Sequence, residues 1–222
     1  MWFSVLVAAL TAYLLGNLNG SVCISALVVH EDVRSHGSGN AGLTNFVRNY
    51  GVQHGLLVLA IDFIKAVCAC LVAGLMLKSY GYYLEGVLLG GVAVTLGHDF
   101  PALLGFRGGK GILCGLAIAA VADWRIALAI LAVFLLAYLA TQYVSLGSIL
   151  AAVTYAVLFI LWHHDRPLVM AGGIFIGVLA VVLAALIVWM MVLVSGIQGT
   201  ARVVNYAGLV RGETQRLVKM EI

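Results

Sequence analysis

The chain has 222 residues, of which 64% are apolar and only 9% are charged, and its formal net charge is +3. Soluble globular domains are about 45–50% apolar and about 25% charged, so this composition excludes a soluble enzyme, a disordered tail and a coiled coil. The small, dispersed positive charge excludes a nucleic-acid-binding domain. The apolar residues suffice for about seven spans of about 20 residues each, which predicts an all-α integral membrane protein without a separate water-soluble domain.

Polar interruptions divide the chain into seven apolar segments, and we expect each to be a transmembrane helix of one domain covering residues 1–222. Continuous apolar runs without alternation argue against a barrel. Residues 2–29 carry no positive charge, which argues for a retained first span rather than a cleaved signal peptide. Two spans are short, and the sequence leaves open whether they form one hairpin. The predicted spans are Trp2–Val29, His54–Leu77, Tyr83–Leu96, Gly111–Val121, Arg125–Gln142, Leu146–Trp162 and Leu168–Ser195.

The distribution of Lys and Arg predicts the orientation of the chain. If the N-terminus lies outside, eight of the 12 Lys and Arg residues fall in cytoplasmic segments, three fall on the opposite side, and Lys65 falls within a span. This bias predicts seven spans with the N-terminus outside and the C-terminus in the cytoplasm. It also places four polar, glycine-rich segments on the cytoplasmic side, which is more typical of an interfacial enzyme than of a transporter. These segments are residues 31–53, 97–111, 142–148 and 200–222.

The first of these segments contains a run of small polar residues that suits an anion. Its glycines allow backbone amides to turn toward a bound group, and Arg48 adds a planar charged fork that matches phosphate or carboxylate. Thr44 is a candidate cap for a helix that runs from Asn45 into the second span. An ordinary loop whose glycines and asparagines only form turns is the alternative interpretation. The neutral hydrogen-bonding side chains are Ser38, Asn40, Thr44 and Asn45.

The second segment contains a Gly-Gly-Lys-Gly turn, Gly108–Gly111, at the expected start of a helix. Free amides, the helix dipole and the Lys110 ammonium together suit a phosphate group. The spacing from Gly105 does not match a Walker A loop, so ATP binding is not supported. The alternative is a tight interfacial turn in which Arg107 and Lys110 reach toward lipid headgroups.

Three weaker features complete the set of candidate residues. His98, at the end of a span, suits a proton carrier, a phosphate ligand or a packed structural residue. Asp62 and Lys65 are three residues apart on one helix face, and we favour a structural ion pair over a substrate contact because charges within a span need partners. Ser145 lies where the fifth span turns into the sixth. The sequence contains no His-Cys metal cluster, so we predict no metal site.

Taken in order, these segments resemble the bacterial acyl-phosphate:glycerol-3-phosphate acyltransferases, the PlsY family. The resemblance runs from about Gly16 to Glu213, and its first two motifs are the most specific. The chain departs from the family pattern in its tail, where Arg202 and Gly208 replace the usual His and Arg. The matching motifs are Ser38-Gly39-Asn40-x-Gly42-x-Thr44-Asn45-x-x-Arg48, Asp62-x-x-Lys65, Gly97-His98-x-x-Pro101, Gly105-Phe106-x-Gly108-Gly109-Lys110-Gly111, Val144-Ser145-Leu146 and Asn205-x-x-x-Leu209-x-x-Gly212.

The resemblance implies a multi-pass protein of the bacterial cytoplasmic (inner) membrane with its active site facing the cytoplasm. It implies an enzyme of phospholipid biosynthesis that transfers a fatty acyl group from acyl phosphate to the 1-hydroxyl of sn-glycerol 3-phosphate. The products are 1-acylglycerol 3-phosphate (lysophosphatidate) and phosphate. The resemblance implies no metal, no cofactor and no covalent acyl-enzyme. The expected catalytic residues are Ser38, Arg48, Lys110 and His98.

Such an enzyme mainly has to hold two anions close together and screen charge as phosphate departs. The group that takes the hydroxyl proton stays open between a phosphate oxygen of the substrate and His98. We expect the departing phosphate beside Ser38, Asn40, Thr44 and the Gly108–Lys110 turn, and the glycerol phosphate beside Arg48, Lys110, Ser145 and Asn205. The expected substrate-binding residues are Ser38, Asn40, Thr44, Asn45, Arg48, Gly108, Gly109, Lys110, Ser145 and Asn205, with Asp62 and Lys65 as a structural pair.

Two other classes of protein compete with the acyltransferase. A small-anion transporter needs polar residues on both sides of the membrane, and the expected outer loops lack them. An inactive membrane scaffold has no need of the motif residues, yet Ser38, Thr44, Arg48 and Gly108–Gly111 are all intact. The leading prediction is therefore an acyltransferase whose partners are acyl phosphate, glycerol 3-phosphate and the lipid bilayer. It predicts no nucleic-acid partner and leaves the oligomeric state open.

Overall fold

The computed structural model describes residues 1–182, 185–186, 189 and 193, and its secondary structure over these residues is entirely helical. Residues Met1–Leu183 form one compact unit. The all-α prediction is therefore confirmed for the described part of the chain. Its α-helices are α1 (Trp2–Gly16), α2 (Gly20–Ile24), α3 (Leu43–Tyr50), α4 (Val52–Lys78), α5 (Tyr83–Asp99), α6 (Ile112–Ala122), α7 (Trp124–Thr141) and α8 (Val144–Trp162), followed by the helix Pro167–Val182.

Several of these helices have the length and composition of membrane spans. Four are long and apolar enough to cross a membrane, namely α4, α5 with its short 3₁₀ extension to Leu104, α7 and α8. The segment Trp2–Val29 passes the same test as a bent pair of helices. Helices α6 and Pro167–Val182 are apolar but shorter. The structure thus supports a multi-pass membrane protein. Most of the predicted last span beyond residue 182, and all of residues 200–222, lie outside the described residues.

The predicted first span, Trp2–Val29, is not one continuous helix. It bends by 40° between α1 and α2, at the short polar run Asn17–Asn19. The Asn19 side chain accepts a hydrogen bond from Val22 N at 3.1 Å and so caps a new helix. The break therefore has a local cause, because an Asn that satisfies the first amides of a helix ends the preceding one.

Three further boundaries differ from prediction. Helix α3 begins at Leu43 with Gly42 as its cap, so Thr44 lies inside the helix and does not cap it. Gly51 adopts a positive φ of 82° and separates α3 from α4, which begins a new direction. The other two boundaries lie beyond the expected ends of their helices. Helix α5 continues past Leu96 to Asp99, and α8 begins at Val144 rather than at Leu146.

Small residues bring the first helices into close contact. A Cβ added at Gly16 of α1 would lie 2.8 Å from the Cα of Gly97 of α5, and one at Gly90 would lie 2.7 Å from the Ala69 carbonyl of α4. Small residues at such crossings let helix backbones approach within a membrane. They fix the C-terminal end of α5, which carries His98, against α1 and α4.

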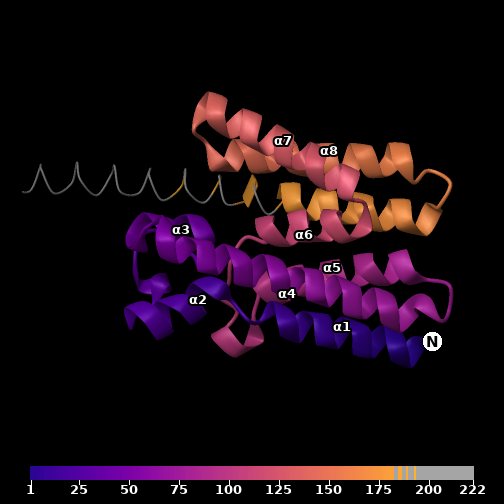
Figure 1. Cartoon of the computed structure of the whole chain (residues 1–222), viewed down its shortest axis with the longest axis horizontal. Helices are drawn as coiled ribbons and strands as arrows, with labels where there is room; N and C mark the ends of the chain where they lie inside the picture. Colours follow the sequence, from indigo (N-terminus) through magenta and orange to yellow (C-terminus); the bar gives the residue numbers. More distant parts are fainter. Residues whose placement is uncertain (183–184, 187–188, 190–192, 194–222) are drawn as a thin grey trace, which may run out of the picture. The chain divides into compact units, whose positions relative to one another are not determined.

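The polar segments collect at one end of the unit. Figure 1 shows the N-terminus of α1 and the α4–α5 and α6–α7 turns at one end, and α3, the start of α6 and the α7–α8 turn at the other. We call the second of these the loop end. Because each long helix reverses direction, residues 31–51, 100–111 and 142–143 all lie at this end although they are far apart in sequence.

Candidate active site

The first loop is folded around the side chain of Asn45. Its Oδ1 accepts a hydrogen bond from Ser38 N at 2.9 Å, and its Nδ2 donates to the carbonyl oxygens of Val33 at 3.2 Å, His36 at 3.0 Å and Asn40 at 3.0 Å. Asn45 is buried. Its hydrogen bonds shape the loop, and its predicted contact with substrate stays a prediction.

Other predicted residues of the first loop face outward. Ser38, Thr44 and Arg48 are exposed, and Asn40 is half-buried. Thr44 and Arg48 are four residues apart on α3 and therefore share a helix face. The hydroxyls of Ser38 and Thr44 form no hydrogen bond with any described residue. These side chains have hydrogen-bonding capacity to offer a ligand, in contrast to Asn45.

The first loop docks directly on the glycine-rich turn. Ala41 N donates to Gly108 O at 3.2 Å, and Asn19 Nδ2, from the break in the first span, donates to Ala41 O at 2.9 Å. On the far side of the turn, Gly109 N donates to His98 O at 3.0 Å. The two segments that the sequence predicted to bind one anion are therefore in contact.

Below the turn lies a buried ion pair. Lys65 Nζ is 2.9 Å from Asp62 Oδ1 and 2.8 Å from His98 Nδ1, and both charged residues are at most 5% exposed. Lys65 also donates to Gly16 O at 3.2 Å and to Leu18 O. The two residues that we favoured as an ion pair thus form one, and Lys65 connects it to His98 and to the break in the first span.

These contacts form a closed ring through the loop end. Starting from Leu18, the ring passes through Asn19 and the first loop to the glycine-rich turn, then through His98 and Lys65 back to Leu18. Sequence reasoning missed Asn19, although an Asn-x-Asn-Gly interruption within an apolar run was a visible signal. The ring members are Leu18, Asn19, Ala41, Gly108, Gly109, His98 and Lys65.

The electrostatics of the site favour an anion. Burial, and then the nearby Arg48 guanidinium, lower the pKa of Lys110 below its ordinary value. Neither Arg48 nor Lys110 forms an ion pair with an acidic residue in the described part of the chain. The Arg48 charge disfavours the charged form of Lys110, and an anion bound near Lys110 relieves this repulsion.

The start of α6 continues the site. Gly111 precedes α6 with a positive φ of 62°, and a Cβ there would lie 2.8 Å from Thr95 Cγ2 and 3.2 Å from Asp99 Oδ1. A side chain would therefore meet both an unfavourable backbone conformation and occupied space. Asp99, which sequence reasoning passed over, is buried, and neither of its carboxylate oxygens has a hydrogen-bond partner among the described residues.

Two predicted residues are not joined to this cluster. Ser145 is half-buried in the first turn of α8 at the loop end, and it forms no hydrogen bond to residues 31–51 or 100–111 in the described structure. Asn205 lies outside the described residues, as do the tail departures Arg202 and Gly208. The contribution of these residues stays a prediction.

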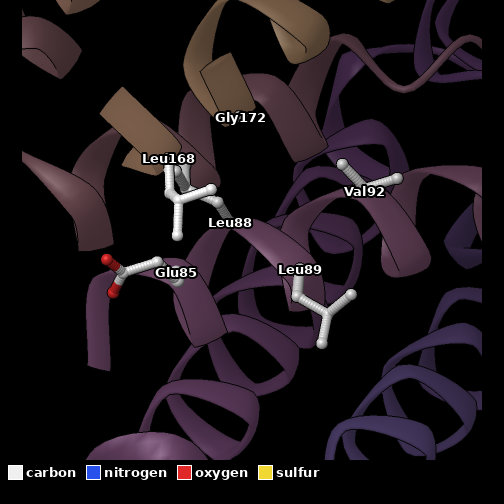
Figure 2. A pocket seen from close by; sticks show the side chains of 6 residues that line it. All are labelled: Glu85, Leu88, Leu89, Val92, Leu168 and Gly172. Atoms are coloured by element: carbon white, nitrogen blue, oxygen red, sulfur yellow. The ribbon is translucent and has the colours of Figure 1, made fainter. Parts of the chain in front are cut away.

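An apolar pocket of about 320 Å³ lies between α5 and the helix Pro167–Val182. Figure 2 shows its walls, where one carboxylate side chain stands among aliphatic ones. Three of the lining positions of α5, at 85, 88 and 92, continue at spacings of three and four to Thr95 and Asp99, so they share one helix face with the start of the glycine-rich site. The lining residues are Glu85, Leu88, Leu89, Val92, Leu168 and Gly172.

Comparison with known proteins gives a consistent result. The family model described as glycerol-3-phosphate acyltransferase matches residues 6–204. A glycerol-3-phosphate acyltransferase of Finegoldia magna is 41% identical over 159 residues, covering 70% of this chain and 78% of the relative. One of Shouchella clausii is 38% identical over 191 residues, covering 85% and 89%.

Solved structures agree with the sequence relatives. PlsY (YgiH), an integral membrane glycerol 3-phosphate acyltransferase, matches in its glycerol 3-phosphate form with a TM-score of 0.75 and 33% identity, covering 85% of this chain and 92% of that one. Its lysophosphatidic acid form matches with a TM-score of 0.73 and 32% identity over the same shares. A family match across nearly the whole chain, together with relatives above 30% identity, decides the assignment: this chain belongs to the glycerol-3-phosphate acyltransferase family.

Proposed function

We propose that this chain is a membrane acyltransferase that transfers a fatty acyl group from acyl phosphate to the 1-hydroxyl of sn-glycerol 3-phosphate. The observation that carries this proposal is the contact between the first loop and the glycine-rich turn, which places Lys110 where the Arg48 charge acts on it. Both substrates are anions, and this site offers two cations together with the available hydroxyls of Ser38 and Thr44. The glycerol 3-phosphate and lysophosphatidic acid forms of the solved relative correspond to one substrate and one product of this reaction.

The acyl transfer mainly requires donors that stabilise the departing phosphate, and this site provides them. The glycerol 1-hydroxyl attacks the acyl carbonyl carbon, the bond between that carbon and the phosphate oxygen breaks, and its electron pair leaves with phosphate. The hydroxyl proton passes to a phosphate oxygen of the substrates or to His98. Lys110 and the Gly108 amide stabilise the charge that develops on the departing phosphate, because fixed donors need no reorganisation during the reaction.

The binding roles divide between the two loops. Ser38, Asn40 and Thr44 hold the departing phosphate together with the Gly108–Lys110 turn. Arg48 orients glycerol 3-phosphate, since a guanidinium can bind two phosphate oxygens at once. Holding both anions in one orientation converts a bimolecular reaction into an effectively unimolecular one. We extend the glycerol phosphate site to Ser145 and Asn205 on the sequence motifs alone.

The proposed arrangement in the membrane has seven spans, an outer N-terminus and a cytoplasmic loop end. The five candidate spans, α6 and Pro167–Val182 together supply seven apolar segments. The positive-inside bias supports this orientation. The proposal places the protein in the bacterial inner membrane, where soluble glycerol 3-phosphate reaches the loop end from the cytoplasm.

The acyl chain is proposed to extend along α5 from the glycine-rich turn into the pocket of Figure 2. At 1.5 Å per residue, the face from Asp99 to Glu85 covers about 21 Å. This is more than half of the hydrocarbon core of about 30 Å, and the aliphatic walls suit a hydrocarbon chain. The pocket would then hold the far end of the chain, away from the reacting carbonyl.

Purified protein in lipid nanodiscs provides the test. With palmitoyl phosphate and glycerol 3-phosphate we expect lysophosphatidate and inorganic phosphate in equal amounts, and we expect both to be lost in Lys110→Ala and Arg48→Ala. Lys78→Ala, at the opposite end of α4, is the matched control because it also removes one cation. Folded wild-type protein that forms no product from acyl phosphate, acyl-CoA or acyl-carrier protein would contradict the enzyme proposal and direct attention to anion transport in sealed vesicles.

A further inference from the structure

The two helices that line the apolar pocket approach each other closely at Gly172. A Cβ added there would lie 3.0 Å from Leu88 Cδ1, so a larger side chain would fill the space between the helices. Leu88 is buried, whereas Leu168, one helical turn before Gly172, is exposed. The missing side chain of Gly172 therefore keeps the pocket of about 320 Å³ open beside Leu88.

One carboxylate interrupts the otherwise aliphatic walls of the pocket. Glu85 lies in the first turn of α5, three residues before Leu88, so both side chains lie on the same helix face. Figure 2 shows the Glu85 carboxylate at the edge of the group of aliphatic side chains. It forms no ion pair with a residue in the described part of the chain. Water must therefore solvate its charge, and an apolar group that displaced this water would be disfavoured.

The depth of these residues matches the length of an acyl chain. At about 1.5 Å per residue, Leu88 lies about 16 Å from Asp99 along α5, and Glu85 lies about 21 Å from it. The acyl chains of one leaflet fill half of a hydrocarbon core of about 30 Å. A chain of the length found in the bilayer thus reaches the level of Leu88 and Gly172, and a longer chain meets Glu85.

From this geometry we infer that Gly172 and Glu85 set the chain length of the acyl donor. Gly172 admits the end of the chain beside Leu88, and the Glu85 carboxylate stops a longer chain. The inference rests on the proposed function. Each methylene that the aliphatic walls take out of water favours binding, until the next one has to displace water from the carboxylate. A carboxylate also accepts hydrogen bonds from hydroxyls, so the pocket fits a donor with a hydroxyl at the end of its chain.

A series of acyl phosphates in lipid nanodiscs tests both residues. In Glu85→Leu we expect the kcat/KM of arachidoyl phosphate relative to palmitoyl phosphate to rise about three- to tenfold, the effect of a few methylenes in an apolar pocket. In Gly172→Val we expect the ratio of palmitoyl to lauroyl phosphate to fall by a similar factor. Because each ratio is taken within one variant, a general loss of folded protein cancels. An unchanged ratio in either variant would overturn the inference.

Two matched variants control for effects outside the pocket. Asp165→Asn removes an exposed carboxylate that does not line the pocket. Gly115→Ala adds a methyl group where the Cβ position has open space around it. Both should leave the two ratios within about twofold of the wild type, and shifts as large as those in Glu85→Leu and Gly172→Val would overturn the inference.

A donor with a terminal hydroxyl separates the carboxylate from the volume of the side chain. The wild type should use ω-hydroxypalmitoyl phosphate about as well as palmitoyl phosphate, because Glu85 accepts a hydrogen bond from the hydroxyl. Glu85→Leu should discriminate against it about tenfold, since the hydroxyl would be buried without a partner. Glu85→Gln, which keeps an oxygen acceptor, should resemble the wild type. Equal use of the two donors by Glu85→Leu would overturn the role of the carboxylate.

Photolabelling locates the end of the chain without turnover. A non-hydrolysable palmitoyl phosphonate with a terminal diazirine should label Leu88 and residues 168–172, and excess unlabelled phosphonate should abolish the labelling. This result in a protein that forms no product would contradict only the proposed function. Labelling spread over exposed residues of α7, such as Leu128 and Leu136, that excess phosphonate does not reduce would overturn the inference and assign the pocket to a bilayer lipid.

Discussion

The two ends of the helical unit differ in whether their charged residues form ion pairs. In the α6–α7 turn, opposite the loop end, Asp123 accepts from Arg125 N at 3.1 Å, from Nε at 3.0 Å and from a terminal guanidinium nitrogen at 2.7 Å. The guanidinium also lies over the Trp162 ring, 4.9 Å from its centroid. At the loop end, the Arg48 charge acts on Lys110, and no described acidic residue forms an ion pair with either of them.

The pKa shifts of Asp123 and Lys110 show the same difference between the two ends. The Arg125 side chain, through its hydrogen bond, lowers the pKa of Asp123 and stabilises its charged form. Burial and then Arg48 lower the pKa of Lys110, which disfavours its charged form. A turn whose charges neutralise each other needs no ligand for charge balance. A cation held near another cation is stabilised when an anion binds.

Removal of the Lys110 charge tests this contrast most strongly. We expect Lys110→Met to lower kcat/KM for glycerol 3-phosphate by about 10²- to 10³-fold, the usual cost of losing one donor to developing charge. Arg125→Met also removes a cation but should change steady-state activity less than twofold. Similar losses in the two variants would contradict the division between a binding end and a structural end.

Gly109→Ala probes the space beneath the anion site. Its Cβ would collide with His98 Nε2, whereas the Cβ of Gly115→Ala meets open space. We expect Gly109→Ala to raise the inhibition constant of inorganic phosphate by at least tenfold and Gly115→Ala to leave it within twofold. Equal phosphate binding by both variants would show that the turn tolerates displacement and that its contact with His98 is unimportant.

The pH dependence of phosphate binding should reflect the state of Lys110. Its ammonium is charged below its pKa, and that pKa is lowered, so binding should be strong at lower pH and weaken as pH rises through a value below that of ordinary lysine. Lys110→Arg keeps its charge throughout this range and should remove the alkaline decline. A decline that persists in Lys110→Arg would assign it to another group.

Asp123→Ala tests the structural end. The Asp123 side chain caps α7, so its loss should cost about 0.5–2 kcal/mol of stability, measured as a lower unfolding temperature in detergent. Because the pKa of Asp123 is lowered in the folded protein, its stabilisation is present above the pKa of the unfolded chain and is lost as pH falls through the lowered value. The wild type and Asp123→Ala should therefore converge in stability at acid pH. Asp123→Asn, which keeps an oxygen acceptor, should be less affected at neutral pH.

The smallest expected effect concerns the acyl chain. Leu168→Trp adds bulk to the wall of the pocket and should reduce the kcat/KM ratio of long to short acyl phosphates about three- to tenfold, the effect of a few methylenes in an apolar pocket. Leu128→Trp, on exposed α7 surface away from the pocket, is the control. An unchanged chain-length profile in Leu168→Trp would contradict the proposed path of the acyl chain.

The sequence predicted the long helices closely because membrane spans depend on local composition. The expected span His54–Leu77 corresponds to α4, Val52–Lys78, and Arg125–Gln142 corresponds to α7, Trp124–Thr141. The ends and breaks of helices were harder to predict from the sequence, since they depend on local contacts at single residues. The break at Asn17–Asn19 follows from such a contact, whereas α3 begins at Leu43, after Gly42, without a side-chain cap.

An anionic ligand could also be predicted from the sequence, because glycine, small polar residues and cations suit an anion in any fold. The sequence could not show which polar residues of the first loop hold the loop together and which remain available to a ligand. The structure shows Asn45 engaged by four hydrogen bonds within the loop, while the hydroxyls of Ser38 and Thr44 remain available among the described contacts.

By itself, then, the amino-acid sequence determined the membrane class, most of the spans and the anionic nature of the ligand, all of which follow from local composition and from residue chemistry. Only the tertiary structure decided which residues meet. His98 and Lys65 are 33 positions apart, and Ala41 reaches Gly108 although the helices α3, α4 and α5 lie between them in the chain. Such contacts depend on how closely α1, α4 and α5 pack through their small residues, and no spacing along the chain encodes that approach.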